Sequence, residues 1–135
     1  MQRMQHKRQV VDALARGDSL DGVDMRGIDL AGVNFDGASM VHAKLAECNL
    51  ARATFRNAKL FGASFWHSEC KDVVFDGADL EDADLDLCNL DGCSFRGARV
   101  RKALFPFGRL PLASLLESVR SGSRVRMERR GPEDD

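Results

Sequence analysis

The sequence lacks most of the features that mark an enzyme or a membrane protein. Its 135 residues include no tyrosine, one tryptophan and three prolines, and all three prolines lie beyond residue 105. No apolar stretch approaches the length that spans a bilayer, and there is no signal-peptide pattern. No glycine-rich phosphate loop follows an apolar run that could form a strand. These absences predict a cytoplasmic protein of bacterial type, one domain in size, with no membrane partner.

What the chain does contain is a large apolar side chain at every fifth residue from Leu20 to Phe105. Leucine, methionine or phenylalanine occupies all of these positions except Cys70 and Val100, and the phase never slips. In most repeats a small residue, usually alanine, stands two places earlier. A period of five fits neither a helix nor a strand. A short fixed period is typical of a solenoid, in which each coil packs on the next.

A longer period of twenty is superimposed on the period of five. Phe35, Phe55, Phe75 and Phe95 recur at this spacing, and each is followed two residues later by glycine or asparagine. Those two residue types tolerate the left-handed backbone of tight turns. Four five-residue repeats therefore form one coil, and the four phenylalanines are predicted to form a buried stack that is part of the structural core.

These repeats resemble the pentapeptide-repeat family, whose consensus is A-(D/N)-L-x-x. The match reads V-D-M-R-G, I-D-L-A-G and V-N-F-D-G, then A-D-L-E-D and A-D-L-D-L, within residues 18–105. The resemblance implies an all-β solenoid: a right-handed quadrilateral β-helix, here of a little over four coils. It also implies that the central residue and the small residue of each repeat both point inward.

Segments outside the repeats are predicted to cover the open ends of the coil. We expect an N-terminal capping helix in residues 1–17, the pentapeptide-repeat β-helix in 18–107, and a C-terminal capping helix in 108–122. Residues 123–135 are charged, lack an apolar period, and are expected to form a flexible tail. The alternative role for the second helix is an end-on homodimer, since some members of the family pair in this way.

Catalytic chemistry is not predicted. His42 and His67 fall at outward turn positions, whereas Cys48, Cys88 and Cys93 take the small inward position and Cys70 takes the large one. A thiol inside the wall cannot meet an imidazole outside it, so a nucleophile and its base are not brought together. The cysteine spacing matches no zinc pattern. We expect no enzyme activity, no metal and no cofactor.

One group of outward residues is apolar. Val41 and Phe61 share a column, Trp66 stands on the next wall, and Leu87 follows one coil later. Exposed aromatic and aliphatic side chains that gather together commonly mark interaction surfaces. These four residues are the candidate partner-binding site, and the predicted function is a rigid protein–protein interaction scaffold. The competing interpretation is that the C-terminal segment folds back and covers them with Phe107.

An acidic stretch suggests a second function. No lysine or arginine separates Lys71 from Arg96, while acidic residues are frequent between them. In the quinolone-resistance branch of the family, the rod mimics DNA and binds DNA gyrase. That alternative would use Asp84, Asp86 and Asp91. Many of the acidic residues have a basic residue twenty positions away, as in the column of Asp36, Arg56, Asp76 and Arg96. The formal net charge of the chain is −1. The field that DNA mimicry requires is thereby weakened. No nucleic-acid partner is expected.

Overall fold

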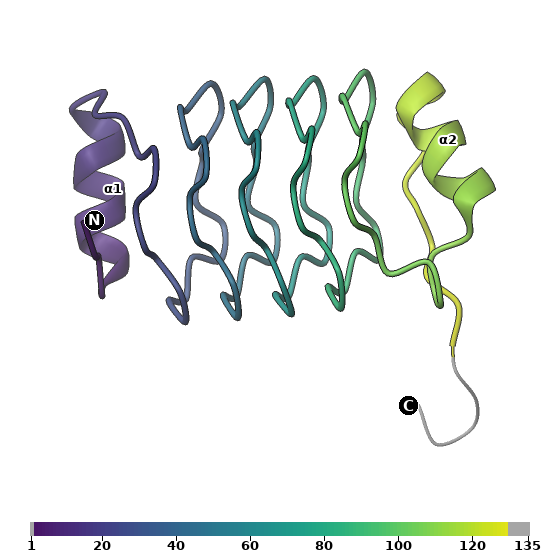
Figure 1. Cartoon of the computed structure of the whole chain (residues 1–135), viewed down its shortest axis with the longest axis horizontal. Coiled ribbons are helices and arrows are strands. Elements are labelled where there is room, and N and C mark those ends of the chain that lie inside the picture. The colour runs from purple at the N-terminus through teal and green to yellow at the C-terminus, as the bar shows by residue number, and fades with distance from the viewer. Residues whose placement is uncertain (1, 130–135) are drawn as a thin grey trace.

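The computed structural model describes residues 2–129, which form a stack of coils with a helix at each end (Figure 1). Helix α1 spans Lys7–Ala15 and helix α2 spans Leu112–Ser121. They lie within the ranges predicted for the two capping helices. Neither helix within 2–129 has the length and apolar character that a bilayer crossing requires.

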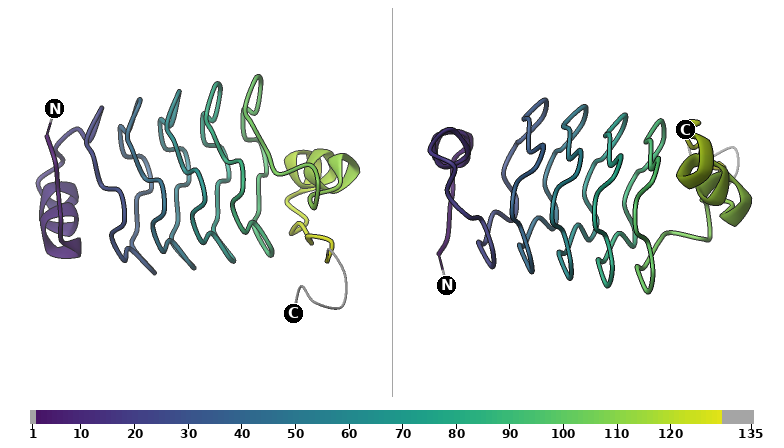
Figure 2. Two further views of the ribbon diagram at one scale, coloured as in Figure 1. Left: turned by 60° about the horizontal axis from the view of Figure 1, so that its bottom comes forward. Right: turned by 90° about the horizontal axis from the view of Figure 1, so that it is seen from above.

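The coils are joined by parallel β-bridges between residues twenty apart. The bridges recur at every fifth residue, from Asp24↔Lys44 to Asp84↔Leu104. Each coil therefore has four short bridging segments separated by turns, and the coils lie side by side in both views of Figure 2. A typical contact is the hydrogen bond from Leu45 N to Ser64 O, at 2.7 Å. The twenty-residue period of the sequence is thus the length of one coil.

Each turn contains one residue with a left-handed backbone. These residues recur every five positions from Gly22 to Lys102, with φ between +58° and +80°. Glycine adopts this conformation without steric strain, whereas other residues are destabilised by about 1–2 kcal/mol. Apart from the glycines, the side chains at this position are polar or charged, with Leu87 as the exception at φ +60°.

The interior is filled as the sequence period predicts. Phe35, Phe55, Phe75 and Phe95 are fully buried. Their rings form one stack, with successive centroids 4.7, 5.4 and 5.2 Å apart and ring planes within 10° of parallel. The four cysteines are also buried inside the coil as free thiols. The thiols at the small inward position donate to carbonyls of the preceding coil, such as Cys93 Sγ to Cys70 O at 2.9 Å.

At the N-terminal end, the chain joins the ladder before α1 begins. Arg3 forms a parallel bridge with Asp24, and Met4 N donates to Asp24 O at 2.9 Å. The Asp24 carboxylate is buried and pairs with Arg3 and with Arg26, each at 2.8 Å. Hydrogen bonding from Arg26 lowers the pKa of Asp24 well below its usual range. This end is therefore closed by a segment that continues the direction of the coils.

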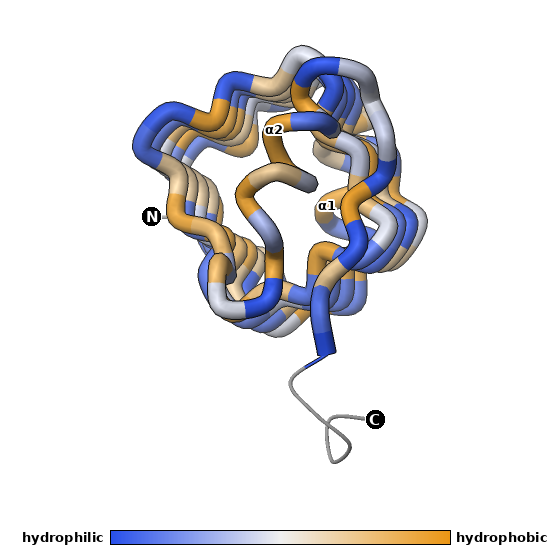
Figure 3. Tube along the Cα trace, turned by 90° about the vertical axis from the view of Figure 1, so that its right-hand side faces the viewer, coloured by the Kyte–Doolittle hydropathy of each residue, from blue (hydrophilic) through white to orange (hydrophobic). Residues whose placement is uncertain are grey.

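The C-terminal end is closed differently. Helix α2 crosses the mouth of the coil, as the view from that end shows (Figure 3). Within α2, Val119 O accepts from Gly97 N, and after the helix Val125 O accepts from Gly92 N, so the chain runs back along the last coil. As the residue number rises from Val119 to Val125, the coil residue that each contacts falls from Gly97 to Gly92. The segment therefore runs antiparallel to the last wall.

The expectation of a flexible tail starting at residue 123 is wrong for the part that the structure describes. Val125 is fully buried, and its N–H donates to Cys93 O at 2.9 Å. The last coil has backbone N–H and C=O groups with no following coil, and buried groups of this kind need partners. Residues 123–128, which we call the C-terminal strap, supply several of them. The rest of the predicted tail, residues 130–135, lies outside the described residues.

Candidate functional site: an apolar corner beside a cavity

Four exposed apolar side chains gather where the last coils meet the C-terminal end. Trp66, Leu87 and Phe107 follow one corner through three successive coils, and Leu104 lies on the adjoining wall. Their exposed fractions are 40%, 47%, 51% and 56%, respectively. We call these four residues the apolar corner. The backbone at Trp66 and Leu104 is held by the coil ladder, through His67 N to Asp86 O at 3.1 Å and Leu104 N to Ala83 O at 2.9 Å. They are therefore displayed on a rigid support.

Leu87 has a backbone that does not suit its side chain. It is the only apolar residue among the described left-handed turn positions, and almost half of it is exposed. In the preceding coil, His67 N donates to the next coil, whereas Leu87 N donates to Asp86 Oδ1 at 2.9 Å. Neither the backbone conformation nor the exposed side chain stabilises the fold. Strain of this kind is commonly found at functional sites.

A cavity of about 190 Å³ lies beside Leu87. It is enclosed by residues 86–89 of the last complete coil, by residues 106–109, and by Met127 of the C-terminal strap. The chain leaves the path of the coil here, because Arg109 N turns back to donate to Pro106 O at 2.9 Å. The hollow is the space that a regular fifth coil would have filled.

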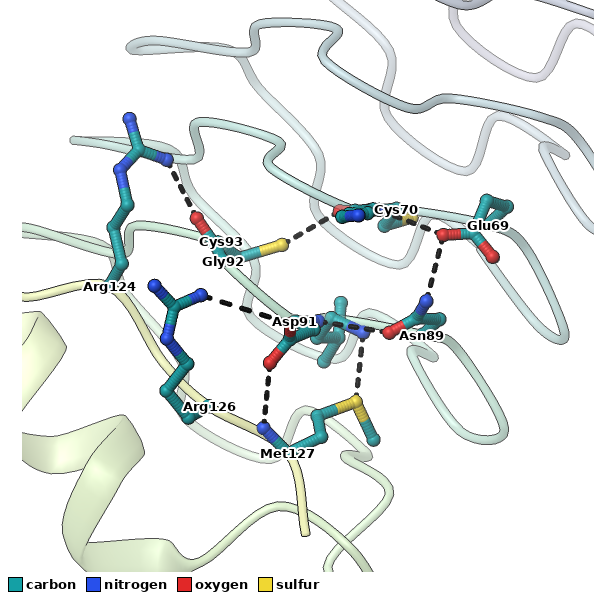
Figure 4. A network of polar contacts seen from close by, with 11 residues as sticks. Glu69, Cys70, Asn89, Asp91, Gly92, Cys93, Arg124, Arg126 and Met127 are labelled. Carbon is teal, nitrogen blue, oxygen red and sulfur yellow. Dashed lines mark hydrogen bonds and ion pairs between the residues drawn. The ribbon is translucent and has the colours of Figure 1, made fainter. Parts of the chain in front are cut away.

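The backbone at this edge lacks the partners found in earlier coils. The carbonyls of Cys48 and Ser68 each accept an N–H from the next coil, but the equivalent carbonyl of Cys88 accepts no hydrogen bond from residues 2–129. Leu90 N donates to the thioether Sδ of Met127 at 3.0 Å, which is a weak acceptor (Figure 4). The cavity thus opens onto an incompletely paired edge.

The four predicted partner-binding residues lie at two neighbouring corners of the coil. Trp66 and Leu87 belong to the apolar corner, whereas Val41 and Phe61 lie on the neighbouring corner and are half-buried. The ring of His42 packs edge-on against Phe61, with centroids 5.6 Å apart. Val41 and Phe61 are therefore packed surface residues more than an open contact site.

The alternative interpretation, in which Phe107 covers these residues, does not agree with their exposure, since Trp66 and Leu87 remain 40% and 47% exposed. Phe107 does not shield Leu87 and Trp66 but is itself half exposed and lines the cavity together with Leu87. Leu104 and Phe107 were not among the predicted site residues. The signal was nevertheless in the sequence, since Phe107 follows Leu87 by the same twenty residues that place Leu87 after His67.

The three predicted acidic residues are separated as well. Asp84 and Asp86 flank the apolar corner, and their carboxylates accept backbone N–H groups from Asp86 and Leu87, at 2.9 Å each. Asp91 instead binds the C-terminal strap, accepting from Met127 N at 3.0 Å and lying 3.8 Å from Arg126 (Figure 4). Within residues 2–129, no ion pair joins Asp84 or Asp86 to a basic side chain.

Reactive side chains do not meet within the described residues. Burial raises the pKa of the Cys48 and Cys93 thiols, which disfavours the reactive thiolate. His42 and His67 occupy outward turns with left-handed backbones. Across residues 2–129 no three His, Cys, Asp or Glu side chains converge in a way that could hold a metal ion. The candidate site is therefore the apolar corner together with the cavity beside it.

The stack of five-residue repeats, closed at both ends, defines a solenoid of the pentapeptide class. The family model for pentapeptide repeats matches residues 19–45, 38–69 and 68–105, with eight copies. The chain therefore belongs to the pentapeptide repeat family. Members of this family are generally structural or interaction proteins.

Three solved structures illustrate the likeness. A pentapeptide repeat protein from the thylakoid lumen of Arabidopsis thaliana is 32% identical with a TM-score of 0.59, covering 59% of this chain and 55% of that one. HetL, a pentapeptide repeat protein from Nostoc sp. strain PCC 7120, is 29% identical with a TM-score of 0.65, covering 67% of this chain and 42% of HetL. The chain thus spans about half the length of these two proteins.

A third protein, also a pentapeptide repeat protein of Nostoc PCC 7120, matches the described fold over a larger share of both chains. It has a TM-score of 0.72 over 86% of this chain and 95% of that one, but only 23% identity, so it shows the fold alone. The comparison with curated proteins gave no match.

Proposed function

We propose that this protein is a non-enzymatic interaction scaffold that presents its apolar corner to another protein. The observation that carries the proposal is Leu87, an exposed apolar side chain on a left-handed backbone. A glycine or asparagine at this position would fit the turn better. Since the left-handed backbone disfavours leucine and almost half of the residue is exposed, a contact made by its side chain is the reason we propose for its presence.

The neighbours of Leu87 support the same function. Trp66 and Phe107 are large aromatic side chains, and aromatic residues at the centre of an interface often contribute most of the binding energy. The backbone at Trp66 is held by the coil, so little conformational entropy would be lost when this residue is covered. We take the coil to be a right-handed quadrilateral β-helix, as the family resemblance implies. We also propose that the protein acts in the cytoplasm.

The likeness to HetL agrees with a role of this kind. HetL is described as involved in heterocyst differentiation regulation. The chain spans less than half of HetL, so this likeness supports the class of function and not a particular process.

Capture of a partner tests the scaffold. We would immobilise the full chain, identify the proteins it retains from a lysate, and measure each dissociation constant with the purified candidate. Trp66→Asp should weaken binding at least tenfold, because it places a charge in the contact surface. The matched control is Val11→Asp, since Val11 on α1 is equally exposed, at 40%. Equal loss of binding in both variants, or in neither, would contradict the proposal.

A supercoiling assay separates the scaffold from DNA mimicry. Neither the wild-type chain nor the double variant Asp84→Asn with Asp86→Asn should inhibit DNA supercoiling by purified gyrase. Asp91 is bound by the C-terminal strap, and the other two acidic residues are partly exposed beside the apolar corner. Inhibition at stoichiometric protein that is lost in the double variant would instead favour the mimic.

An end-on homodimer through α2 is proposed as the assembly. Leu112 and Leu116 are one turn apart on α2, with exposed fractions of 55% and 54%. Two such helices could cover these side chains against each other. Sedimentation equilibrium should show a dimer for the wild-type chain and a monomer for Leu116→Asp. A monomer at all concentrations would remove this part of the proposal.

A further inference from the structure

We propose that the cavity beside Leu87 receives one apolar side chain from an extended segment of the partner, with a lysine or arginine next to it over Asp84 and Asp86. This inference rests on the proposed function, because it names the kind of partner segment that the apolar corner binds. It is carried by the size and walls of the cavity, the incompletely paired backbone edge, and the charges around the rim.

The cavity has the dimensions and walls of a side-chain pocket. Its volume is about 190 Å³, and Leu87, Phe107 and Met127 supply apolar walls. A cavity of about 150 Å³ lined by apolar side chains is large enough to hold benzene. A leucine, methionine or phenylalanine side chain therefore fits. Cys88 presents its backbone here, because its thiol donates inward to Phe65 O at 2.8 Å.

The backbone edge favours an extended segment as the carrier of that side chain. In earlier coils the residue equivalent to Cys88 accepts an N–H from the following coil, as Ser68 O does from Asn89 N at 3.2 Å. The carbonyl of Cys88 has the same place in its coil and no such donor among the described residues. An extended peptide that adds to a sheet edge supplies this donor from its own backbone.

Charge selects the residues beside the inserted side chain. Asp86 lines the cavity and Asp84 stands next to it on the same wall, and neither is in an ion pair within residues 2–129. Arg109 also lines the cavity, and its Nε donates to Glu128 O at 2.9 Å, which directs this side chain toward the C-terminal strap. A basic residue of the partner is therefore complementary to the side of the cavity that carries Asp84 and Asp86.

A capped heptapeptide tests the inference, with leucine at its centre, lysine on each side, and serine and glycine at the ends. We would titrate it into the ¹⁵N-labelled full chain and follow backbone amides together with the fluorescence of Trp66, the single tryptophan. Amide shifts should centre on Leu87, Cys88, Leu90 and Phe107. A peptide with serine in place of leucine, and one with glutamate in place of both lysines, should each bind at least tenfold more weakly.

A variant that fills the cavity provides the second arm. Gly108 lines the cavity, has no left-handed backbone, and a Cβ there would meet no atom within 4 Å. Gly108→Leu should thus weaken binding of the leucine peptide at least tenfold without lowering the melting temperature. Ala113→Leu on α2, an exposed position away from the cavity, is the matched control and should bind as the wild type does.

The outcomes distinguish the two proposals. Shifts centred elsewhere, no shift with any of the peptides, or equal binding of the serine peptide would overturn the cavity inference. If Trp66→Asp abolishes partner capture while Gly108→Leu leaves it unchanged, the scaffold stands and the cavity inference fails. If capture responds to neither variant, the proposed function fails as well.

Discussion

Both ends of the solenoid need a cover over an open coil, and the two covers are built in different ways. At the N-terminal end, Arg3 joins the ladder in parallel with Asp24, as though a further coil preceded it, and α1 covers the interior. At the C-terminal end, the strap runs antiparallel to the last wall, and α2 covers the interior. A segment that runs against the coils pairs with some of their free backbone groups but cannot follow the shape of a complete coil.

This difference explains where the candidate site lies. A regular coil would have covered the edge around Cys88 and Leu90, whereas the strap reaches it with the side chain of Met127. The mismatch leaves a cavity of about 190 Å³ and an exposed Phe107. At the other end, Arg3 and Arg26 instead converge on one buried carboxylate. The features of the candidate site therefore gather where a cap departs from the register of the repeats.

The largest effect is expected in the interior that both ends share. Phe75 stacks between Phe55 and Phe95 and is fully buried, so Phe75→Ala should lower the free energy of unfolding by about 3–5 kcal/mol. Urea denaturation followed by circular dichroism measures the change. Phe107→Ala is the control and should lose much less, because that ring is half exposed. Equal losses would show that the phenylalanine stack is not the core of the coil.

A matched pair of valines compares the two caps directly. Val10 of α1 and Val125 of the C-terminal strap are both fully buried. Changing either to alanine removes two methyl groups and should lower the free energy of unfolding by about 2 kcal/mol.

Hydrogen exchange then tells the two caps apart. Val125→Ala should speed exchange of the Gly92 and Leu90 amides, which bond to Val125 O and Met127 Sδ. Val10→Ala should leave those amides unchanged and loosen the N-terminal end. Faster exchange at Gly92 in both variants would mean that the ends are coupled and do not open separately.

The repeat region could be predicted from the sequence because its constraint is periodic. Every inward position of a coil must match the coils above and below, so Phe35 and Phe95 can be placed without a structure. The C-terminal strap could not be predicted in the same way. Val125 is one apolar residue among charged neighbours, and its burial depends on a long-range antiparallel contact with Gly92 and Cys93. No local pattern encodes such a contact.

The candidate site could be predicted from the sequence only in part. Trp66 and Leu87 were predicted as outward apolar residues because their columns are set by the period. Phe107 is in register with Leu87 and lies within the predicted β-helix of residues 18–107, but the sequence suggested it as a cover over the patch and not as a part of it. The cavity itself depends on how residues 106–109 turn away, and a turn of this kind is decided by tertiary packing that the sequence period does not describe.

A smaller effect, and a gain in the free energy of unfolding, is expected at Leu87. Leu87→Asn replaces a strained left-handed leucine by a residue that tolerates this backbone, and it should raise the free energy of unfolding by about 1 kcal/mol. Thermal or urea unfolding would detect the gain. Binding of the partner should weaken in the same variant, because the exposed leucine is lost. If Leu87→Asn lowered the free energy of unfolding, the claim that leucine is strained at this turn would be wrong.

The smallest effect concerns the N-terminal cap and depends on pH. The pKa of Asp24 is lowered in the folded chain, mainly through the hydrogen bond from Arg26. A carboxyl group whose folded pKa lies below its unfolded value of about 3.9 stabilises the fold above that pH. The stabilisation is lost progressively as the pH falls toward the folded pKa. Its size is reduced because Arg3 and Arg26 are about half exposed, so solvent screens their charges.

Asp24→Asn removes this titration and is therefore the variant to compare. The gap in melting temperature between the wild type and Asp24→Asn should be widest near pH 7 and should narrow below about pH 4. Exchange of the Asp24 and Met4 amides should rise in the variant, because Met4 N and Asp24 N bond across the first ladder position. The Gly92 amide at the opposite end should not change. A gap that stays constant from pH 7 to pH 3 would show that Asp24 acts at this end by its shape and hydrogen bonds, with no contribution from its charge.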